Sequence, residues 1–305
     1  ERMDARVLSV EEVQGLRAYL PTEEEAAMLS AFTGDKTLLG DPEKYFMRMI
    51  TIPLLPERLE AFLFLLTFDA KVKALRVSID NVKKACLEVD GSKHFRTILG
   101  TILELGNILN EGTFAGNAKA YKIESLHRLE ELKSTDGLTN LLQYVVLRFH
   151  DSFPTALGVI QDLQHVQPAS REMFSLMESE LGEIFSGVEC LHRLLEKSED
   201  DSILVEVMSA FKERTKGIPE RLQESLNDCR DVFRRMAKLL VEDPEDGDAP
   251  GSLFRILHLF VYKVVRECDK IEKERREAEA RRERAAMRAE QDKQKKLLAS
   301  QKASA

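Results

Sequence analysis

The chain has 305 residues, of which 43% are hydrophobic and 32% are charged, and its formal net charge at pH 7 is −8. This apolar content is sufficient for a sizeable core, and the mild acidic excess gives no reason to expect a nucleic-acid partner. With 15 glycines, 9 prolines and no tryptophan, a many-turned all-β protein is disfavoured, whereas abundant Leu, Glu, Lys, Arg and Ala favour an all-α fold.

Helix start signals recur in the first part of the chain. Thr22 and Glu25 have the spacing of a capping box. Asp41 followed by Pro42 predicts an N-cap with proline at the first helical position, and Asp69 and Ser92 are further N-cap candidates. Apolar runs beside these signals predict several helices of ordinary length, at residues 45–52, 59–68 and 95–109.

The second half of the chain predicts longer helices. One is expected over residues 170–197, because its apolar side chains follow the alternating steps of four and three that are typical of coiled coils and long bundles. Another is expected over residues 202–241, with a kink or restart where Gly217 precedes Pro219. Because a short polar turn joins these helices, they should pack antiparallel.

The last part of the chain changes from apolar to charged. An acidic loop at residues 242–250 is followed by an apolar helix at residues 253–265. From Glu267 onward, Arg, Lys and Glu alternate with Ala. Pairs at i,i+4 can stabilise such a tail as a solvated helix, but it has no apolar face to bury, so it should project or fray.

Motifs for catalysis, metal binding and cofactor binding are absent from the sequence. No two of the six histidines lie three or four residues apart, as a helical metal pair requires, and the four cysteines are widely spaced without a CxxC pair. We therefore expect reduced thiols, no metal, no cofactor and no enzymatic activity. No apolar run approaches the roughly 20 residues needed to span a bilayer.

The segment from Gly106 to Lys133 stands out, and it reads GNILNEGTFAGNAKAYKIESLHRLEELK. Asn107 and Asn110 lie on one face at the end of an apolar helix, and Gly112 allows the chain to turn back. The two amides could bind the exposed backbone of a partner, because each supplies donors and an acceptor. They could equally serve only as C-terminal caps and loop hydrogen bonds. A second apolar stripe follows, formed by Tyr121, Ile123, Leu126, Leu129 and Leu132.

This segment resembles the signature of the formin homology 2 domain. That signature consists of G-N-x-x-N-x-G, a short Gly-containing loop, an aromatic residue, a Leu-spaced helix, and Lys before a polar turn. The matching residues are Gly106, Asn107, Asn110, Gly112, Tyr121, Leu126, Leu129 and Lys133. Three positions depart from the family pattern: Ala120 replaces a frequent Gly, Tyr121 replaces Phe, and Gln143 replaces a common His.

The resemblance extends over the whole chain and implies an elongated multi-helix rod. Residues 1–68 resemble a knob region that is incomplete at its N-terminus, residues 69–266 resemble the coiled-coil and post helices, and residues 267–305 resemble a charged C-terminal helical tail. Domains of this family form head-to-tail dimers that nucleate actin filaments and stay on the growing barbed end. The resemblance therefore implies a cytoplasmic, cytoskeletal actin-binding module that is not an enzyme.

The resemblance also assigns two sites. In the family, an N-terminal lasso that carries tryptophans wraps the post of the partner subunit. The lasso-docking residues would be Gly106, Asn107, Asn110, Gly112 and Tyr121. The actin-binding basic residue best matches Lys133, with Lys122 and Arg128 as weaker candidates, although Lys133 could also be a solvated lysine at a helix end.

The start of the sequence shapes the expected behaviour of this polypeptide. It begins inside the knob region without an initiator methionine, so we expect a piece of a longer protein that lacks the lasso and is mainly monomeric. Profilin is expected to bind only through a proline-rich segment further upstream. The alternative function is a coiled-coil scaffold or tether without an actin role. A membrane-binding tail is disfavoured, because its basic residues are mixed with acids.

Overall fold

The computed structural model of the chain describes residues 8–135, 137–152, 158–198, 202–245 and 248–303. Helices dominate these residues, and the β pairing found among them is an isolated antiparallel bridge between Lys133 and Asn140. The predicted all-α class is therefore confirmed. The chain divides into two compact units, which consist of Glu1–Asn81 with Glu172–Asp231 and of Val82–Arg171 with Val232–Ala305.

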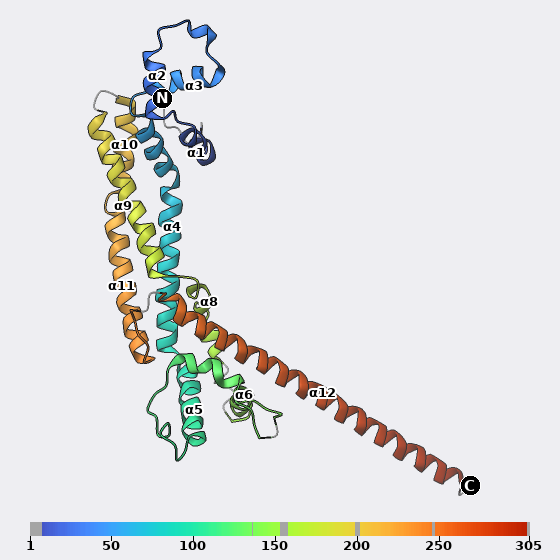
Figure 1. Cartoon of the computed structure of the whole chain (residues 1–305). Helices are drawn as coiled ribbons and strands as arrows, with labels where there is room; N and C mark the ends of the chain where they lie inside the picture. The colour runs from blue at the N-terminus through green and yellow to red at the C-terminus, as the bar shows by residue number, and fades with distance from the viewer. Residues whose placement is uncertain (1–7, 136, 153–157, 199–201, 246–247, 304–305) are drawn as a thin grey trace. The chain divides into compact units, whose positions relative to one another are not determined.

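The first unit combines short N-terminal helices with parts of longer ones. Its elements are α1 (Val10–Ala18), α2 (Glu23–Ala31), η1 (Lys36–Leu38), α3 (Asp41–Ile50), most of α4 (Leu55–Gly91), α9 (Phe174–Lys197), α10 (Ser202–Thr215) and the first part of α11 (Ile218–Leu239) (Figure 1). Helix α2 packs against α3, and α9 packs against α10. The connection between α9 and α10 includes residues 199–201, which lie outside the described residues.

The helix start signals of this unit had mixed outcomes. The capping box of α2 is confirmed, because Glu25 N donates to Thr22 Oγ1 at 3.2 Å and Thr22 N donates to Glu25 Oε2 at 2.8 Å. The N-cap of α3 was placed one residue too late, since Gly40 occupies that position. Asp69 was wrong as an N-cap, because it lies inside α4, where it forms an ion pair with Arg214 at 2.9 Å.

Apolar spacing explains why α4 continues through Asp69. The buried side chains of Phe68, Val72 and Leu75 keep helical spacing across that position, so the helix buries one continuous face.

Gly217, which separates α10 from α11, has a φ of +71°. A left-handed residue cannot continue a right-handed helix, so the predicted break at this glycine is confirmed.

Aromatic packing fixes the approach of α9 to α4. The ring of Phe64 meets the rings of Phe68 and Phe211 edge to face, at centroid distances of 5.4 and 6.1 Å. Gly187 of α9 lies directly against this cluster, since a Cβ atom there would be 2.3 Å from the Phe64 ring. Only a glycine therefore permits this close contact between the helix and the ring.

The second unit consists of shorter elements packed against one long helix. Its elements are the last part of α4, α5 (Lys93–Leu109), η2 (Ile123–Glu130), α6 (Leu141–Ser152), α7 (Val159–Asp162), α8 (Val166–Ala169), the end of α11 and α12 (Gly251–Ala303). Helix α12 packs against η2, α6 and α8. The fully buried rings of Phe254 and Phe260 form part of this core.

Helix α12 is continuous where the sequence suggested an apolar helix followed by a separate tail (Figure 1). Its buried face reaches Glu267, Cys268 and Ile271, beyond the last apolar residue of the expected helix. Beyond Ile271 the described side chains are almost all exposed, and pairs such as Arg276 with Glu272, at 2.8 Å, have the expected i,i+4 spacing. None of the described helices is long and apolar enough to cross a membrane.

The contact between Gly187 and Phe64 can be tested by adding one methyl group. Gly187→Ala should lower the free energy of unfolding by about 1–3 kcal/mol, because the aromatic cluster leaves the Phe64 ring little room to move. Gly182→Ala is the matched control in the same helix. A Cβ atom there meets no atom within 4 Å, so alanine should stabilise the helix by about 0.5–1 kcal/mol. Urea unfolding followed by circular dichroism measures both, and equal effects would contradict the packing.

Candidate partner-binding groove

Helix α5 provides one wall of the candidate site. Ser92 caps its start, since Phe95 N donates to Ser92 Oγ at 3.0 Å. Phe95, Ile98 and Ile102 are buried, but the helix ends with Ile108 66% exposed and Leu109 62% exposed. The first half of α5 is therefore core, whereas its last turn presents apolar side chains to solvent.

The amide of Asn107 is used within the chain. Its Nδ2 donates to the carbonyl oxygen of Ala118 at 2.9 Å, and its Oδ1 accepts from the amide nitrogen of Ala118 at 2.7 Å. These two hydrogen bonds pair the Asn107 side chain with the backbone of Ala118, as a neighbouring β-strand would pair with it. They fix the loop after α5 to the helix. Asn110 is different, because it is the exposed C-cap of α5 and no hydrogen bond of its side chain is found among the described residues.

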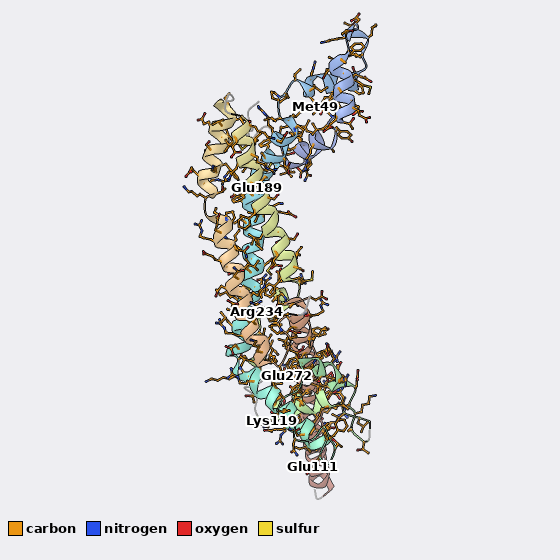
Figure 2. All side chains as sticks on the ribbon, turned by 60° about the vertical axis from the view of Figure 1, so that its left-hand side comes forward. Met49, Glu111, Lys119, Glu189, Arg234 and Glu272 are labelled. Carbon is orange, nitrogen blue, oxygen red and sulfur yellow. The ribbon has the colours of Figure 1, made fainter. Side chains whose placement is uncertain are left out.

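The loop from residue 110 to residue 122 depends on its glycines. Gly112 has a φ of +79°, which side chains with a Cβ atom rarely adopt. Gly116 lies so close to Asn110 that a Cβ atom would be 2.7 Å from the Asn110 carbonyl oxygen. The polar side chains of Glu111 and Lys119 lie at the surface of this loop (Figure 2).

Tyr121 closes the loop against α5. Its hydroxyl donates to the carbonyl oxygen of Leu99 at 3.3 Å. Burial disfavours the charged phenolate, so it raises the pKa of Tyr121 well above its usual value. The hydroxyl that distinguishes this residue from the phenylalanine of the family signature is therefore a hydrogen-bond donor at neutral pH.

The Leu-spaced helix expected after Tyr121 is a 3₁₀ helix, η2. Its buried residues Ile123, Leu126 and Leu129 recur every three positions, and a 3₁₀ helix has three residues per turn, so this spacing places them in one row. The backbone N–H at the start of η2 has its hydrogen-bond acceptor elsewhere in the unit, because Ile123 N donates to Glu242 Oε1 at 2.6 Å.

A tight turn joins η2 to α6 and carries Lys133. Leu141 N donates to the Leu132 carbonyl oxygen at 2.8 Å. The next residues inward, Lys133 and Asn140, form the isolated antiparallel β-bridge. Asn140 then caps α6, since its Oδ1 accepts from Gln143 N at 2.8 Å while Asn140 N donates to Gln143 Oε1 at 3.1 Å. This reciprocal cap holds the turn at the start of α6.

These elements enclose a groove of about 1010 Å³. We call it the groove; it lies between the last half of α5, the loop that follows, η2, the turn before α6 and the first turns of α6. Among its lining residues are six of the eight site residues predicted from the sequence: Gly106, Asn107, Asn110, Tyr121, Arg128 and Lys133. Gly112 and Lys122 are not among the lining residues; Gly112 shapes the turn, and Lys122 is the exposed residue before η2.

Sequence reasoning missed the apolar surface of the groove. Its lining includes four large, exposed apolar side chains, which are Ile108, Leu109, Leu132 and Tyr144. Ile108 and Leu109 stand between the two signature asparagines, so the available signal was a pair of apolar residues at the end of a helix. Their exposure, however, depends on where η2 and α6 pack, which the local sequence does not reveal.

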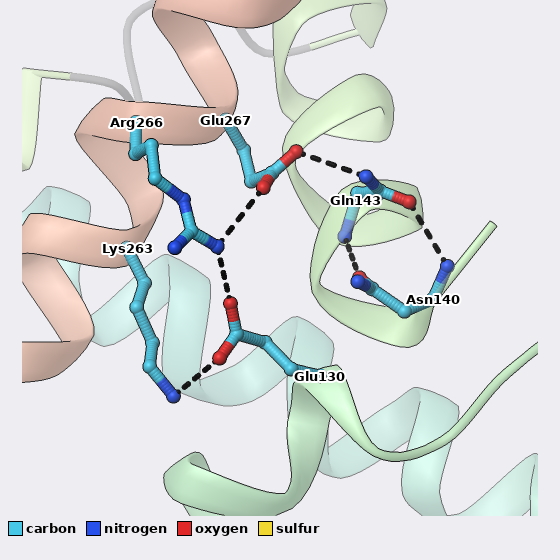
Figure 3. A network of polar contacts seen from close by, with 6 residues as sticks. All are labelled: Glu130, Asn140, Gln143, Lys263, Arg266 and Glu267. Atoms are coloured by element: carbon cyan, nitrogen blue, oxygen red, sulfur yellow. Dashed lines mark hydrogen bonds and ion pairs between the residues drawn. The ribbon is translucent and has the colours of Figure 1, made fainter.

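A polar network fixes η2 and α6 to α12 (Figure 3). Glu130 Oε2 accepts from Lys263 Nζ at 2.6 Å, and Glu130 Oε1 accepts from Arg266 Nη2 at 2.5 Å. The buried carboxylate of Glu267 accepts from Gln143 Nε2 at 3.1 Å and from Arg266 at 3.2 Å. A buried carboxylate needs such partners, so Gln143, one of the departures from the family pattern, supports α12 as well as its own helix cap.

The groove is suited to binding a chain segment. It offers exposed apolar side chains, the exposed amide of Asn110 and two basic side chains at Arg128 and Lys133. In the described part of the chain, no group of three or more His, Cys, Asp or Glu side chains is placed to hold a metal ion. The arrangement can therefore recognise backbone, apolar and acidic groups of a partner.

Comparison with known proteins places the chain in a family. The family model of the Formin Homology 2 Domain matches residues 1–265. Formin-like protein 21b of Arabidopsis thaliana is 30% identical over 97% of this chain and 74% of that protein. Formin-like protein 14 of the same plant is 27% identical over 94% of this chain, and formin-like protein 3 of Oryza sativa subsp. japonica is 29% identical over 83% of this chain.

The chain therefore belongs to the formin homology 2 domain family, as its Gly106–Lys133 signature indicated. The matched parts are 24% of formin-like protein 14 and 20% of formin-like protein 3. The chain thus spans only about a quarter or a fifth of the length of these two relatives.

The two signature asparagines are expected to respond differently to substitution. Asn107→Ala should lower the free energy of unfolding by about 1–2 kcal/mol, because it leaves the backbone N–H and C=O of Ala118 without their partner. It should also accelerate hydrogen exchange at the Ala118 amide. Asn110→Ala is the control and should change stability by less than about 0.5 kcal/mol. Similar effects of the two variants on stability and exchange would contradict the structural role of Asn107.

The network at Glu130 predicts a pH dependence. Hydrogen bonds and charge attraction, first from Lys263 and then from Arg266, lower the pKa of Glu130. Because its folded-state pKa lies below its unfolded value, the pairs stabilise the fold above the ordinary glutamate pKa of about 4.3. This contribution disappears as the pH falls through the lowered value.

Glu130→Gln should therefore cost about 1 kcal/mol at neutral pH, and the difference from the unmodified chain should vanish under acid conditions. Urea unfolding at a series of pH values measures this convergence. Glu131→Gln, at an exposed neighbouring carboxylate, is the control and should show little effect at any pH. A difference at Glu130 that persists unchanged in acid would show that the ion pairs are not its cause.

Proposed function

We propose that the full-length protein, with its lasso present, nucleates actin filaments and stays at the growing barbed end as a head-to-tail dimer, with the groove of this chain receiving an extended segment of the second subunit. The observation that carries the proposal is the groove, which unites four signature residues, Gly106, Asn107, Asn110 and Tyr121, with exposed apolar side chains. Apolar patches within a concave surface are typical of protein-binding sites.

Gly106 and Asn110 support a docking role because the chain does not need them for its own packing. A Cβ atom at Gly106 would meet no heavy atom within 4 Å, although glycine inside a helix costs about 0.5–1 kcal/mol relative to alanine. A partner backbone that approaches α5 closely would explain the glycine. The amide of Asn110 can then pair with that backbone, as the amide of Asn107 pairs with Ala118.

Three exposed cations form the proposed actin-binding surface: Lys133, Arg128 and Lys122. The bridge to Asn140 fixes the backbone of Lys133, so its ammonium group projects from a defined position. The module acts by binding different arrangements of actin subunits, without any enzymatic step, and its proposed location is the cytoplasmic actin cytoskeleton. Profilin is proposed as a partner only of a proline-rich segment outside these 305 residues.

The proposal is tested with the full-length protein in a pyrene-actin assembly assay. The unmodified protein should accelerate assembly from monomers, and Lys133→Asp should reduce this acceleration by about tenfold, because the variant reverses the charge of the proposed actin contact. The thermal stability should not change, since Lys133 is exposed. Lys119→Asp makes the same charge change at an exposed loop residue that does not line the groove, and it should retain activity.

Two results would overturn parts of this proposal. If the unmodified protein does not accelerate assembly, a coiled-coil scaffold without an actin role becomes the better explanation. If it does, but Lys133→Asp and Lys119→Asp act alike, Lys133 is only a solvated surface residue.

A further inference from the structure

The charge of the groove is opposite to that of the chain around it. The sequence contains 53 acidic and 45 basic residues. Yet among the described residues that line the groove none is acidic, and two are cations, Arg128 and Lys133. An acid-free lining in an acidic chain creates a local positive potential that favours an anionic group.

Both cations are available for a partner. Arg128 and Lys133 are exposed, and neither forms an ion pair with another described residue. Lys263 and Arg266 of α12 show the opposite behaviour, since both are paired with Glu130. The two groove cations thus keep their hydrogen-bond donors, which in arginine form a planar fork that matches a carboxylate.

The network behind the groove removes one neighbouring carboxylate from competition. Glu130 and Glu131 lie between Arg128 and Lys133 in the sequence, and neither lines the groove. The two oxygens of Glu130 are bound by Lys263 and Arg266 on α12 (Figure 3). The ion pairs with α12 therefore keep Glu130 from neutralising the groove cations.

The cations and the apolar side chains lie on different walls. Leu109 and Ile108 belong to the end of α5, whereas Arg128 is on η2 and Lys133 is in the turn before α6. A segment that lies in the groove can place apolar side chains against α5 and a carboxylate toward η2 and the turn.

We infer that the groove selects a segment of a second copy that carries a carboxylate side chain beside apolar residues, and that Arg128 and Lys133 bind this carboxylate. This inference rests on the proposed docking function and adds its chemical specificity. It gives two of the three proposed actin-binding cations a second role, in assembly of the dimer, which can be measured without actin.

The experiment measures the dimer dissociation constant of the full-length protein by sedimentation, without actin, at about 50 and about 300 mM NaCl. The double variant Arg128→Gln/Lys133→Gln should weaken the dimer by about tenfold at the lower salt concentration. Its difference from the unmodified protein should shrink at the higher concentration, because salt screens the lost attraction. Lys119→Gln, which removes an exposed cation outside the groove, should have little effect.

A third variant separates this inference from the docking proposal. Leu109→Ser alters an exposed apolar side chain of the groove without changing its charge, so it should weaken the dimer if the groove is the docking site. If Leu109→Ser weakens the dimer and the double charge variant does not, the carboxylate inference is wrong while docking stands. If neither variant weakens it, the docking proposal itself fails. Equal weakening by Lys119→Gln would indicate general electrostatics and would also overturn the inference.

Discussion

The pairing of the Asn107 amide with the Ala118 peptide is the interaction on which the groove depends. Its two hydrogen bonds hold a loop of otherwise weak secondary structure against the end of α5. Once this loop is fixed, Tyr121 can reach the Leu99 carbonyl and η2 can begin where its buried row meets the core. The amide satisfies the backbone N–H and C=O of one residue, so a single side chain replaces a short strand pairing in an all-helical unit.

The opposite wall depends on charge instead of backbone pairing. Glu130 and Glu267 connect η2 and α6 to α12 through Lys263, Arg266 and Gln143. Glu267 is buried, so its partners chiefly offset the cost of desolvating it, and the network specifies position more than it adds stability. A binding surface benefits from side chains that are already held in place, because a partner loses affinity when it must order loosely held side chains.

Local sequence predicted the features that local physics determines. The capping box at Thr22, the start of α5 after Ser92 and the break at Gly217 each depend on a few neighbouring residues. The Asp69 assignment failed because the apolar face of α4 outweighs a single cap candidate. The 3₁₀ form of η2 was not specified in advance, because a spacing of three also fits an α-helix loosely. Six of the eight predicted site residues line the groove. Its exposed apolar wall and the Gln143–Glu267 contact, which joins residues 124 positions apart, arise only when the chain is folded.

The positive charge of the groove lining is opposite in sign to the net charge of the whole chain, and this difference bears on how two copies can associate. Two copies with a formal net charge of −8 each repel one another at long range, although screening limits this repulsion to distances of about 8 Å at physiological salt. Attraction that acts within contact distance must therefore overcome it. Apolar burial supplies such attraction without orientation, whereas the carboxylate that we infer between Arg128 and Lys133 would fix the register of the docked segment. Binding of Glu130 to Lys263 and Arg266 of α12 keeps that carboxylate from pairing with the groove cations, so the lining retains positive charge that an acidic segment of a second copy can meet.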